Sequence, residues 1–184
     1  TSGIASCAAP ITYSGPDTAA TTRSGSCTDA AGNSSSESIV LHYDSTAPTT
    51  DAASSPAPNG NGWLRTPTTI SWTGSDATSG VASCHPQMSY GGPDTSGTAE
   101  TGSCTDNAGN SSSDTFMVRY DTVAPGTVAT PDRAPNGAGW YRAPVSITWI
   151  GSDGRSGIDS CSSPVTYRGP DTASVTRTGS CTDD

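Results

Sequence analysis

The sequence predicts an all-β protein made of several small antiparallel β-sandwiches in tandem. Three observations support this expectation: the chain repeats itself every 77 residues, short runs alternate apolar with polar residues, and six cysteines occur in evenly spaced pairs. Short alternating runs are typical of strands, and no stretch has the period of a helix. Paired cysteines are typical of small domains whose cores are too thin to be stable alone.

The composition argues against one large core. Only 31% of the 184 residues are hydrophobic, and leucine occurs only at Leu41 and Leu64. Disorder is the other interpretation of such a composition, but disordered chains are poor in aromatic residues, and this chain has four Trp and six Tyr. We therefore expect several small domains that each bury little surface.

Four motifs recur at intervals of 77 residues without an insertion or deletion, and internal repeats of this kind decide the architecture. Ser-Gly-Ile-Ala-Ser-Cys or a close variant begins at Ser2, Ser79 and Ser156, Gly-Pro-Asp-Thr at Gly15, Gly92 and Gly169, Gly-Ser-Cys-Thr-Asp at Gly25, Gly102 and Gly179, and Pro-Asn-Gly-x-Gly-Trp at Pro58 and Pro135.

Two Ala-Pro segments, Thr46-Ala47-Pro48 and Val123-Ala124-Pro125, mark the boundaries between copies. Each follows a strand-like run, and proline cannot continue a central strand. The chain then contains a partial first copy (residues 1–45), a complete second copy (46–122) and a partial third copy (123–184). We interpret it as a window on a longer array. The alternative is that the partial ends complete each other by strand exchange.

The expected strands have a period of two. Ile70 and Trp72 fall on one face of the run 68–73, and the same pattern returns in the third copy. A later run alternates in the same way, and we expect Val118 and Tyr120 to complete the core of the second copy. The equivalent pattern residues are Val145, Ile147 and Trp149 in the third copy, and Ile39, Leu41 and Tyr43 in the first.

The cysteines of each copy are 20 positions apart. Six cysteines allow fifteen pairings, and self-contained copies select Cys7 with Cys27, Cys84 with Cys104, and Cys161 with Cys181. Each bond would contribute about 3 kcal/mol in the chain-entropy description. The absence of a CxxC pair argues against a zinc site or a redox-active pair. Disulfides place the protein in an oxidising compartment.

The net charge of −9 excludes most nucleic-acid binding, because phosphate recognition requires a positive surface. No run of about 20 apolar residues is present, so we expect no membrane insertion in this segment. No signal peptide is visible. Any export or anchoring signal would lie outside this piece.

The run from Gly62 to Cys84 resembles bacterial immunoglobulin-like (Big) tandem repeats of secreted surface proteins, as do Cys104-Thr-Asp-Asn-Ala-Gly-Asn110 and Tyr120-Asp121-x-x-Ala-Pro125. The Thr-Asp-x-Ala-Gly-Asn turn is also similar to hyalin-type repeats. The resemblance implies immunoglobulin-like sandwiches with one intradomain disulfide each, at an extracellular or cell-surface location. The spacing of 20 between cysteines departs from the antibody pattern, so the antibody inter-sheet bridge is not implied.

The most specific hypothesis for a functional site is a calcium site. Asp44 and Asp121 end the last strand of their copies, and Asp76 and Asp153 recur in a Gly-Ser-Asp turn. Similar tandem repeats bind calcium at domain junctions, and calcium takes six to eight oxygen ligands. The alternative, which we favour, is that these residues only make Asx-turn hydrogen bonds. Asp29, Asp106 and Asp183 also recur, the first two before an Ala-Gly-Asn turn. No other cofactor is expected.

Catalysis is not expected. The two histidines, His42 and His85, occupy non-equivalent positions in different copies, and a catalytic triad requires a positioned base. We expect Gly-Pro-Asp-Thr to form a hairpin tip, with a ligand-binding loop as the alternative. Trp63 and Trp140 are expected to pack beneath a loop, with an exposed sugar platform as the alternative.

The sequence thus predicts a structural repeat of an extracellular bacterial surface protein that forms a stiff stalk, spacer or fibre. Its partners would be neighbouring repeats of the same or of identical chains. One alternative is a self-assembling filament subunit with strand exchange between copies. The other is an adhesin or carbohydrate-binding module that contacts host-surface or matrix glycans.

Overall fold

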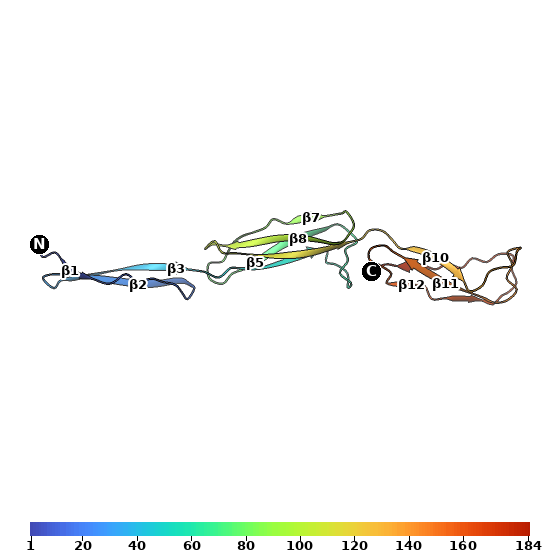
Figure 1. Ribbon diagram of the computed structural model, residues 1–184, viewed down its shortest axis with the longest axis horizontal. Helices are drawn as coiled ribbons and strands as arrows, with labels where there is room; N and C mark the ends of the chain where they lie inside the picture. The colour runs from blue at the N-terminus through green and yellow to red at the C-terminus, as the bar shows by residue number, and fades with distance from the viewer. The chain divides into compact units, whose positions relative to one another are not determined.

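A computed structural model describes all residues, Thr1–Asp184, and the regular structure consists only of β-strands (Figure 1). The strands form five small sheets, and the pairings within them are antiparallel. The expectation of an all-β protein with several small antiparallel sheets is therefore confirmed. The structure contains no helix of the length and apolarity needed to span a membrane.

The strands follow the repeat. In the first copy, β1 (Ile4–Cys7), β2 (Thr18–Asp29) and β3 (Ser34–Tyr43) form one sheet in this order. In the second copy, one sheet consists of β4 (Thr49–Ser55), β5 (Thr68–Ser75) and β7 (Met88–Tyr90), and another of β6 (Val81–Cys84), β8 (Thr95–Asp106) and β9 (Ser111–Tyr120). In the third copy, β10 (Gly126–Pro131), β11 (Val145–Ser152) and β13 (Val165–Tyr167) form one sheet, and β12 (Ser160–Cys161) pairs with β14 (Cys181–Thr182).

The chain divides into two compact units, each assembled from separate segments. The first unit contains Thr1–Ala53, Ile70–Met88 and Thr101–Phe116, and the second contains Ser54–Thr69, Ser89–Glu100 and Met117–Asp184. Strands β4, β5, β7, β8 and β9 contribute residues to both units.

Three disulfides are present, and no cysteine is free. They join the pairs that self-contained copies select, and each closes a local hairpin because the two cysteines lie directly opposite on paired strands: Cys7–Cys27, Cys84–Cys104 and Cys161–Cys181. Each bond therefore connects neighbouring strands of one sheet. Three disulfides indicate an oxidising compartment.

In the first unit, the core lies where β5 meets β8. Ile70 and Trp72 share one face of β5 and are buried, as the alternation predicts. The indole of Trp72 lies against Gly102, where an added Cβ would stand within 2.7 Å of three ring atoms. Gly74 approaches Cys104 in the same way, with an added Cβ 2.9 Å from the sulfur. Glycines at these positions allow the two sheets of the second copy to touch.

The second unit repeats this arrangement 77 positions later. Trp149 on β11 is buried, and an added Cβ on Gly179 would stand within 2.5 Å of three atoms of its ring. Gly151 approaches Cys181, with an added Cβ 3.0 Å from the sulfur. The same unit buries Val118 and Tyr120 of β9, as expected for the core of the second copy. Gly74 and Gly102, and their equivalents Gly151 and Gly179, are therefore close-approach positions.

The last strand is less buried in the first copy. Ile39, which is equivalent to Phe116 in β9, is 60% exposed. Its neighbour Val40 is exposed as well, as is Met117 in the second copy. The two later copies bury Trp72 and Trp149 between a β5-type sheet and a disulfide hairpin, whereas β1, β2 and β3 form a single sheet. An alternating pattern predicts which residues share a face, but it does not say whether that face is covered.

Candidate metal centres at the repeat junctions

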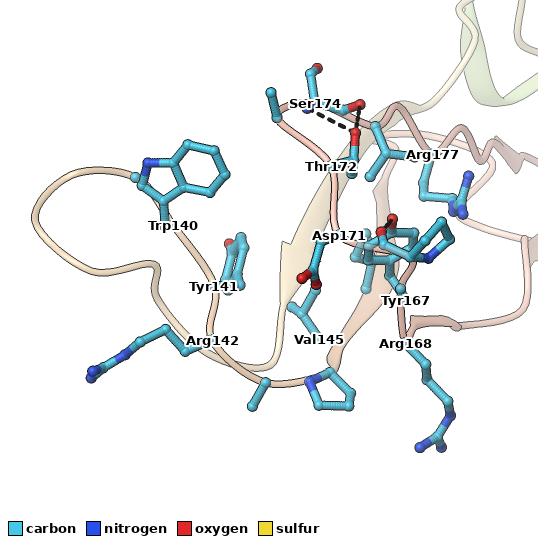
Figure 2. A pocket seen from close by; sticks show the side chains of 18 residues that line it. Trp140, Tyr141, Arg142, Val145, Tyr167, Arg168, Asp171, Thr172, Ser174 and Arg177 are labelled. Carbon is cyan, nitrogen blue, oxygen red and sulfur yellow. Dashed lines mark hydrogen bonds between the residues drawn. The ribbon is translucent and has the colours of Figure 1, made fainter.

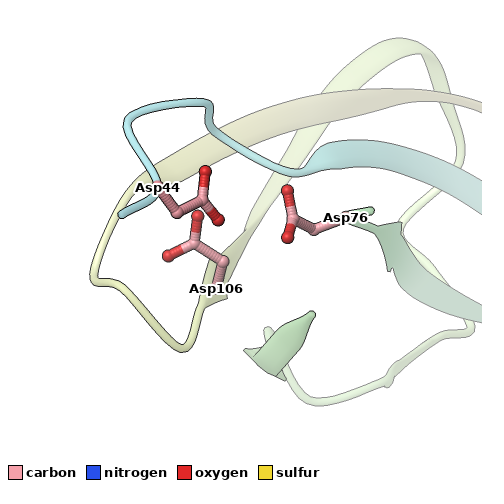
Figure 3. Close-up of side chains that lie close together, drawn as sticks. All are labelled: Asp44, Asp76 and Asp106. Carbon is pink, nitrogen blue, oxygen red and sulfur yellow. The ribbon is translucent and has the colours of Figure 1, made fainter. Parts of the chain in front are cut away.

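Three aspartates from three different motifs meet at the start of the second copy. Asp44 follows β3, Asp76 follows β5, and Asp106 ends β8. One carboxylate oxygen from each lies within 4.8 Å of the others, and Figure 3 shows the three carboxylates facing one another. Asp106 is buried, and the other two are half-buried. We call this group the first Asp triad.

A second Asp triad occurs 77 positions later. It consists of Asp121, Asp153 and Asp183, whose oxygens again lie within 4.8 Å of one another. Each triad takes one aspartate from the end of one copy and two from the copy that follows. The repeat therefore builds the same cluster twice, each time inside one compact unit.

Five of the six triad aspartates, all except Asp183, also accept hydrogen bonds from nearby backbone amides. Asp76 Oδ1 accepts hydrogen bonds from the amides of Thr78, Ser79 and Gly80, at 2.8–3.2 Å. Asp106 Oδ1 accepts hydrogen bonds from two amides of the Ala-Gly-Asn turn, at 2.8 and 2.9 Å. These are the Asx-turn contacts proposed as the alternative to metal binding. The same aspartate side chains therefore both form the turns and lie together in the triad.

The aspartate that ends each copy joins the linker to the next copy. Asp44 Oδ1 accepts a hydrogen bond from the amide of Thr46, and its Oδ2 accepts one from the amide of Ser79, at 3.1 and 3.0 Å. Asp121 makes the equivalent pair of bonds with Val123 and Ser156, at 3.0 and 3.1 Å. One carboxylate therefore fixes both the linker and, in the following copy, the turn that comes after β5 or β11.

No arginine forms a salt bridge with a member of either Asp triad. Burial raises the pKa of Asp106, but hydrogen bonds from Asn110, Gly109 and Ala108 outweigh this effect and lower it overall. Hydrogen bonds from the amides of Arg155 and Gly157 lower the pKa of Asp153. These carboxyl groups are therefore ionised at neutral pH. The salt bridge of the chain joins Arg133 to Asp132, outside both triads.

The donor set fits a calcium ion in its chemistry. Carboxylate oxygens are the hard ligands that calcium prefers, and three aspartates supply up to six of the six to eight oxygens that it takes. Of the sequence-predicted residues, the structure brings Asp44 to Asp76 and Asp121 to Asp153. Sequence reasoning placed the third members, Asp106 and Asp183, only in a turn. Their recurrence as aspartate at the same 77-residue interval was the available signal.

The histidines have ordinary surroundings. His85 packs edge-on against Trp72, with 4.8 Å between ring centroids, and its Nδ1 lies 2.9 Å from the carbonyl oxygen of Pro86. The Nδ1 atom of His42 contacts the carbonyl oxygen of Ala19. Both side chains are exposed.

Comparison with protein-family models, curated proteins and solved structures gives no match for this chain. The class of protein therefore rests on its own geometry: an all-β chain with disulfide-closed hairpins and repeated aspartate clusters.

Proposed function

We propose that this chain is a structural repeat of an extracellular bacterial surface protein and acts as a segment of a stiff stalk, spacer or fibre. The observation that carries this proposal is the bonding of Asp44 and Asp121, each to its linker and to the next copy. Each linker amide is hydrogen-bonded to a carboxylate that also binds the next copy, so the linker loses torsional freedom. An array of such junctions resists bending.

Further contacts of the linkers support the same role. Asp17, in the Gly-Pro-Asp-Thr loop, accepts hydrogen bonds from the amide and hydroxyl of Ser45 and from the hydroxyl of Thr46, at 2.5–3.1 Å. In the next copy, Asp94 accepts a hydrogen bond from the Thr122 hydroxyl at 3.1 Å. Sequence reasoning assigned this loop to a hairpin tip, but in the second copy it connects β7 to β8, which lie in different sheets. The loop also holds the linker.

Each copy is proposed to be an immunoglobulin-like β-sandwich. The contact between two sheets at Trp72 and Gly102, and its recurrence at Trp149 and Gly179, supports this part of the proposal. Face-to-face packing of two small antiparallel sheets is the defining feature of such sandwiches.

Calcium is the proposed occupant of both Asp triads. A divalent cation would neutralise three clustered carboxylates and would tie the end of one copy more firmly to the next. The proposed mechanical role does not depend on the ion, because the hydrogen bonds of Asp44 and Asp121 join the copies without it.

Backbone ¹⁵N relaxation of the oxidised chain tests the mechanical role. We expect order parameters near those of rigid backbone, about 0.85, for the amides of Thr46 and Val123. Combined substitution Asp44→Ala and Asp121→Ala should lower both values, because it removes the acceptor for each linker amide. Asp51→Ala, on the exposed surface of β4, is the matched control. Linker values below about 0.6 in the unaltered chain would exclude a stiff array.

A further inference from the structure

The Pro-Asn-Gly-x-Gly-Trp motif forms a loop that its first asparagine holds closed. In the second copy, the amide of Asn59 donates a hydrogen bond to the Trp63 carbonyl at 2.8 Å. Asn59 Oδ1 accepts hydrogen bonds from the amides of Asn61 and Trp63, at 3.1 and 2.8 Å. The amide of Gly62 donates to the Asn59 carbonyl at 3.0 Å. The side chain of Asn59 is therefore fixed by the backbone that follows it.

The same loop recurs at residues 136–140 of the third copy. Asn136 Oδ1 accepts hydrogen bonds from the amides of Ala138 and Trp140, at 3.1 and 2.8 Å. The amide of Asn136 donates to the Trp140 carbonyl at 2.9 Å, and its carbonyl accepts a hydrogen bond from Gly139 at 2.8 Å. Figure 2 shows Trp140, the residue at which this loop ends. Two copies of the motif therefore hold the asparagine side chain in the same way.

The glycine that follows each of these asparagines is not required by the conformation of the loop. Gly60 and Gly137 do not adopt a positive φ, and an added Cβ at either position would meet no atom within 4 Å. The amides of both glycines make no hydrogen bond. Gly62 and Gly139, in contrast, have φ values of 85° and 84°, which favour glycine. Glycine at positions 60 and 137 therefore has a reason other than backbone conformation.

An exposed Asn-Gly pair holds both reactants of an intramolecular reaction, and all four residues are exposed. The glycine amide loses its proton to hydroxide, and its nitrogen attacks the asparagine Cγ, because glycine has no side chain to hinder the approach. A bond forms between this nitrogen and Cγ, the side-chain nitrogen takes a proton from water, and ammonia leaves. Water then opens the resulting cyclic succinimide at either carbonyl. The products are aspartate or isoaspartate.

The loop favours this reaction at Asn59 in three ways. The hydrogen bond from the Asn61 amide closes a ring that contains the Gly60 nitrogen, so the side-chain carbonyl stays folded toward that nitrogen. Two amides already donate to Oδ1, the oxygen that becomes negatively charged when Cγ is attacked. The Gly60 amide has no acceptor to give up before it reacts. The folded loop thus brings together a nucleophile, an electrophile and donors for the developing charge.

The neighbouring Asn61-Gly62 pair lacks these features. The Gly62 amide donates to the Asn59 carbonyl, and this hydrogen bond must break before the nitrogen can react. Oδ1 of Asn61 accepts no hydrogen bond, so no donor stabilises negative charge on it. The loop therefore distinguishes two pairs that are identical as dipeptides.

We propose that Asn59-Gly60 and Asn136-Gly137 are sites of spontaneous covalent modification, at which the folded loop converts asparagine to aspartate or isoaspartate. Water is the other reactant, and ammonia is the other product. Aspartate retains an oxygen acceptor for the two amides that hold the loop. Isoaspartate lengthens the main chain of the loop by a methylene group and disturbs its bonds to Trp63, which is 8% exposed.

The modification acts beside the end of β9. Leu64 follows the loop directly, its amide donates to the Arg119 carbonyl at 2.9 Å, and its carbonyl accepts a hydrogen bond from the Asp121 amide at 3.0 Å. Asp121 in turn holds the linker at Val123. Isoaspartate at position 59 therefore loosens the backbone next to this linker and makes the junction less stiff with age. This last consequence rests on the proposed function, whereas the modification itself does not.

Mass spectrometry of the oxidised chain, kept at mildly alkaline pH and sampled over weeks, tests the proposal. Fragmentation of peptides that contain residues 59–63 and 136–140 locates each conversion, and protein isoaspartyl methyltransferase labels the isoaspartate. We expect Asn59 to convert about tenfold or more faster than Asn61, because only Asn59 has donors on Oδ1 and a free amide after it. In the reduced and denatured chain, the two asparagines should convert at similar rates.

Gly60→Ala is the matched variant. The added Cβ meets no atom and φ is not positive, so the loop and the melting temperature should be unchanged. Conversion of Asn59 should be largely lost, because the methyl group hinders the attacking nitrogen. Asn136 is the reference within the same chain, and its rate should stay as it is in the unaltered protein.

Two results would overturn the proposal: equal rates at Asn59 and Asn61 in the folded chain, or slower conversion of Asn59 in the folded chain than in the denatured chain. Neither rate depends on the stiffness of the linkers. Low order parameters at Thr46 and Val123 would therefore contradict the proposed function and leave this result unchanged.

Discussion

The indole of Trp72 lies directly over the α-carbon of Gly102, in the space that any larger residue would need for its Cβ. Gly102 is buried in β8 and does not adopt a positive φ, so backbone conformation does not require glycine there. Glycine is required because the Trp72 ring occupies the space of a Cβ atom. In the second and third copies, the Gly-Ser-Cys motif thus begins with glycine because two sheets approach at this point.

Gly102→Ala should therefore destabilise the second copy by about 1–3 kcal/mol, because the ring must move to accommodate the methyl group. Thermal unfolding followed by near-ultraviolet circular dichroism measures the effect. Gly97→Ala is the control on the same strand, since its Cβ would lie 3.6 Å from Met117, at ordinary contact distance. A Gly102→Ala protein as stable as the Gly97→Ala protein would contradict the close approach.

Loss of the hairpin disulfides should expose the chain to proteolysis. Replacing Cys84 and Cys104 by alanine removes a bond across 20 residues, worth about 3 kcal/mol in the chain-entropy description. Limited proteolysis should then cut within residues 81–106 faster than in the equivalent segments of the other copies. Reductant should extend this sensitivity to all three hairpins. Cleavage rates that are indifferent to reductant would mean that the sheets alone hold each hairpin.

The turn around Asp29 should depend on pH in a defined window. Hydrogen bonds from the Asn33 side chain and the Ser2 hydroxyl lower the pKa of Asp29 from 3.8 to about 2. A carboxyl group whose folded-state pKa is lowered stabilises the fold above its unfolded-state pKa. That contribution is lost as the pH falls from about 4 through 2. Carboxyl ¹³C titration should give a midpoint near 2.

Asn33→Ala should raise the titration midpoint of Asp29 toward 3.8, because the largest of the stabilising hydrogen bonds is removed. Ser2→Ala should raise it less. An unchanged midpoint in Asn33→Ala would show that the amide group of Asn33 does not hold the carboxylate.

Calcium should raise the melting temperature of the oxidised chain. An ion that binds only the folded state stabilises it by about 2.7 kcal/mol at a concentration one hundred times the Kd. The paired changes Asp76→Asn and Asp153→Asn keep an oxygen acceptor for each turn but remove one charge per triad. They should abolish most of the calcium-dependent shift. A melting temperature that is equal in calcium and in chelator would leave the triads as turn-forming groups only.

Much of this architecture was predictable because it follows from spacing. The 77-residue interval selects the three disulfides, and the alternation around Ile70 and Trp72 identifies the buried face of β5. The sequence predicts the recurrence of Asp44, Asp76 and Asp106 but not that their carboxylates lie close together. Spacing shows that each position recurs, but distances between motifs separated by more than 25 residues depend on how the strands pair.

Exposure was the least predictable property. Trp63 and Trp140 occupy the same place in the same motif, yet one is 8% exposed and the other 53%. The difference depends on whether a strand end such as Arg119–Asp121 lies beside the tryptophan, which local sequence does not encode. A repeat predicts equivalent conformations, and the segments that pack beside a residue decide whether it is buried.

The position of the disulfides sets how far a copy can lengthen under tension. Each bond joins adjacent strands between cysteines that are 20 residues apart in the sequence. Under tension the force passes through the disulfide, so the segment between the two cysteines does not extend. At about 3.5 Å per extended residue, the excluded contour is about 70 Å per copy. A reduced 77-residue copy could reach about 270 Å when fully pulled out, whereas an oxidised one would stop near 200 Å. The redox state of the surroundings therefore sets the maximum extension of a repeat.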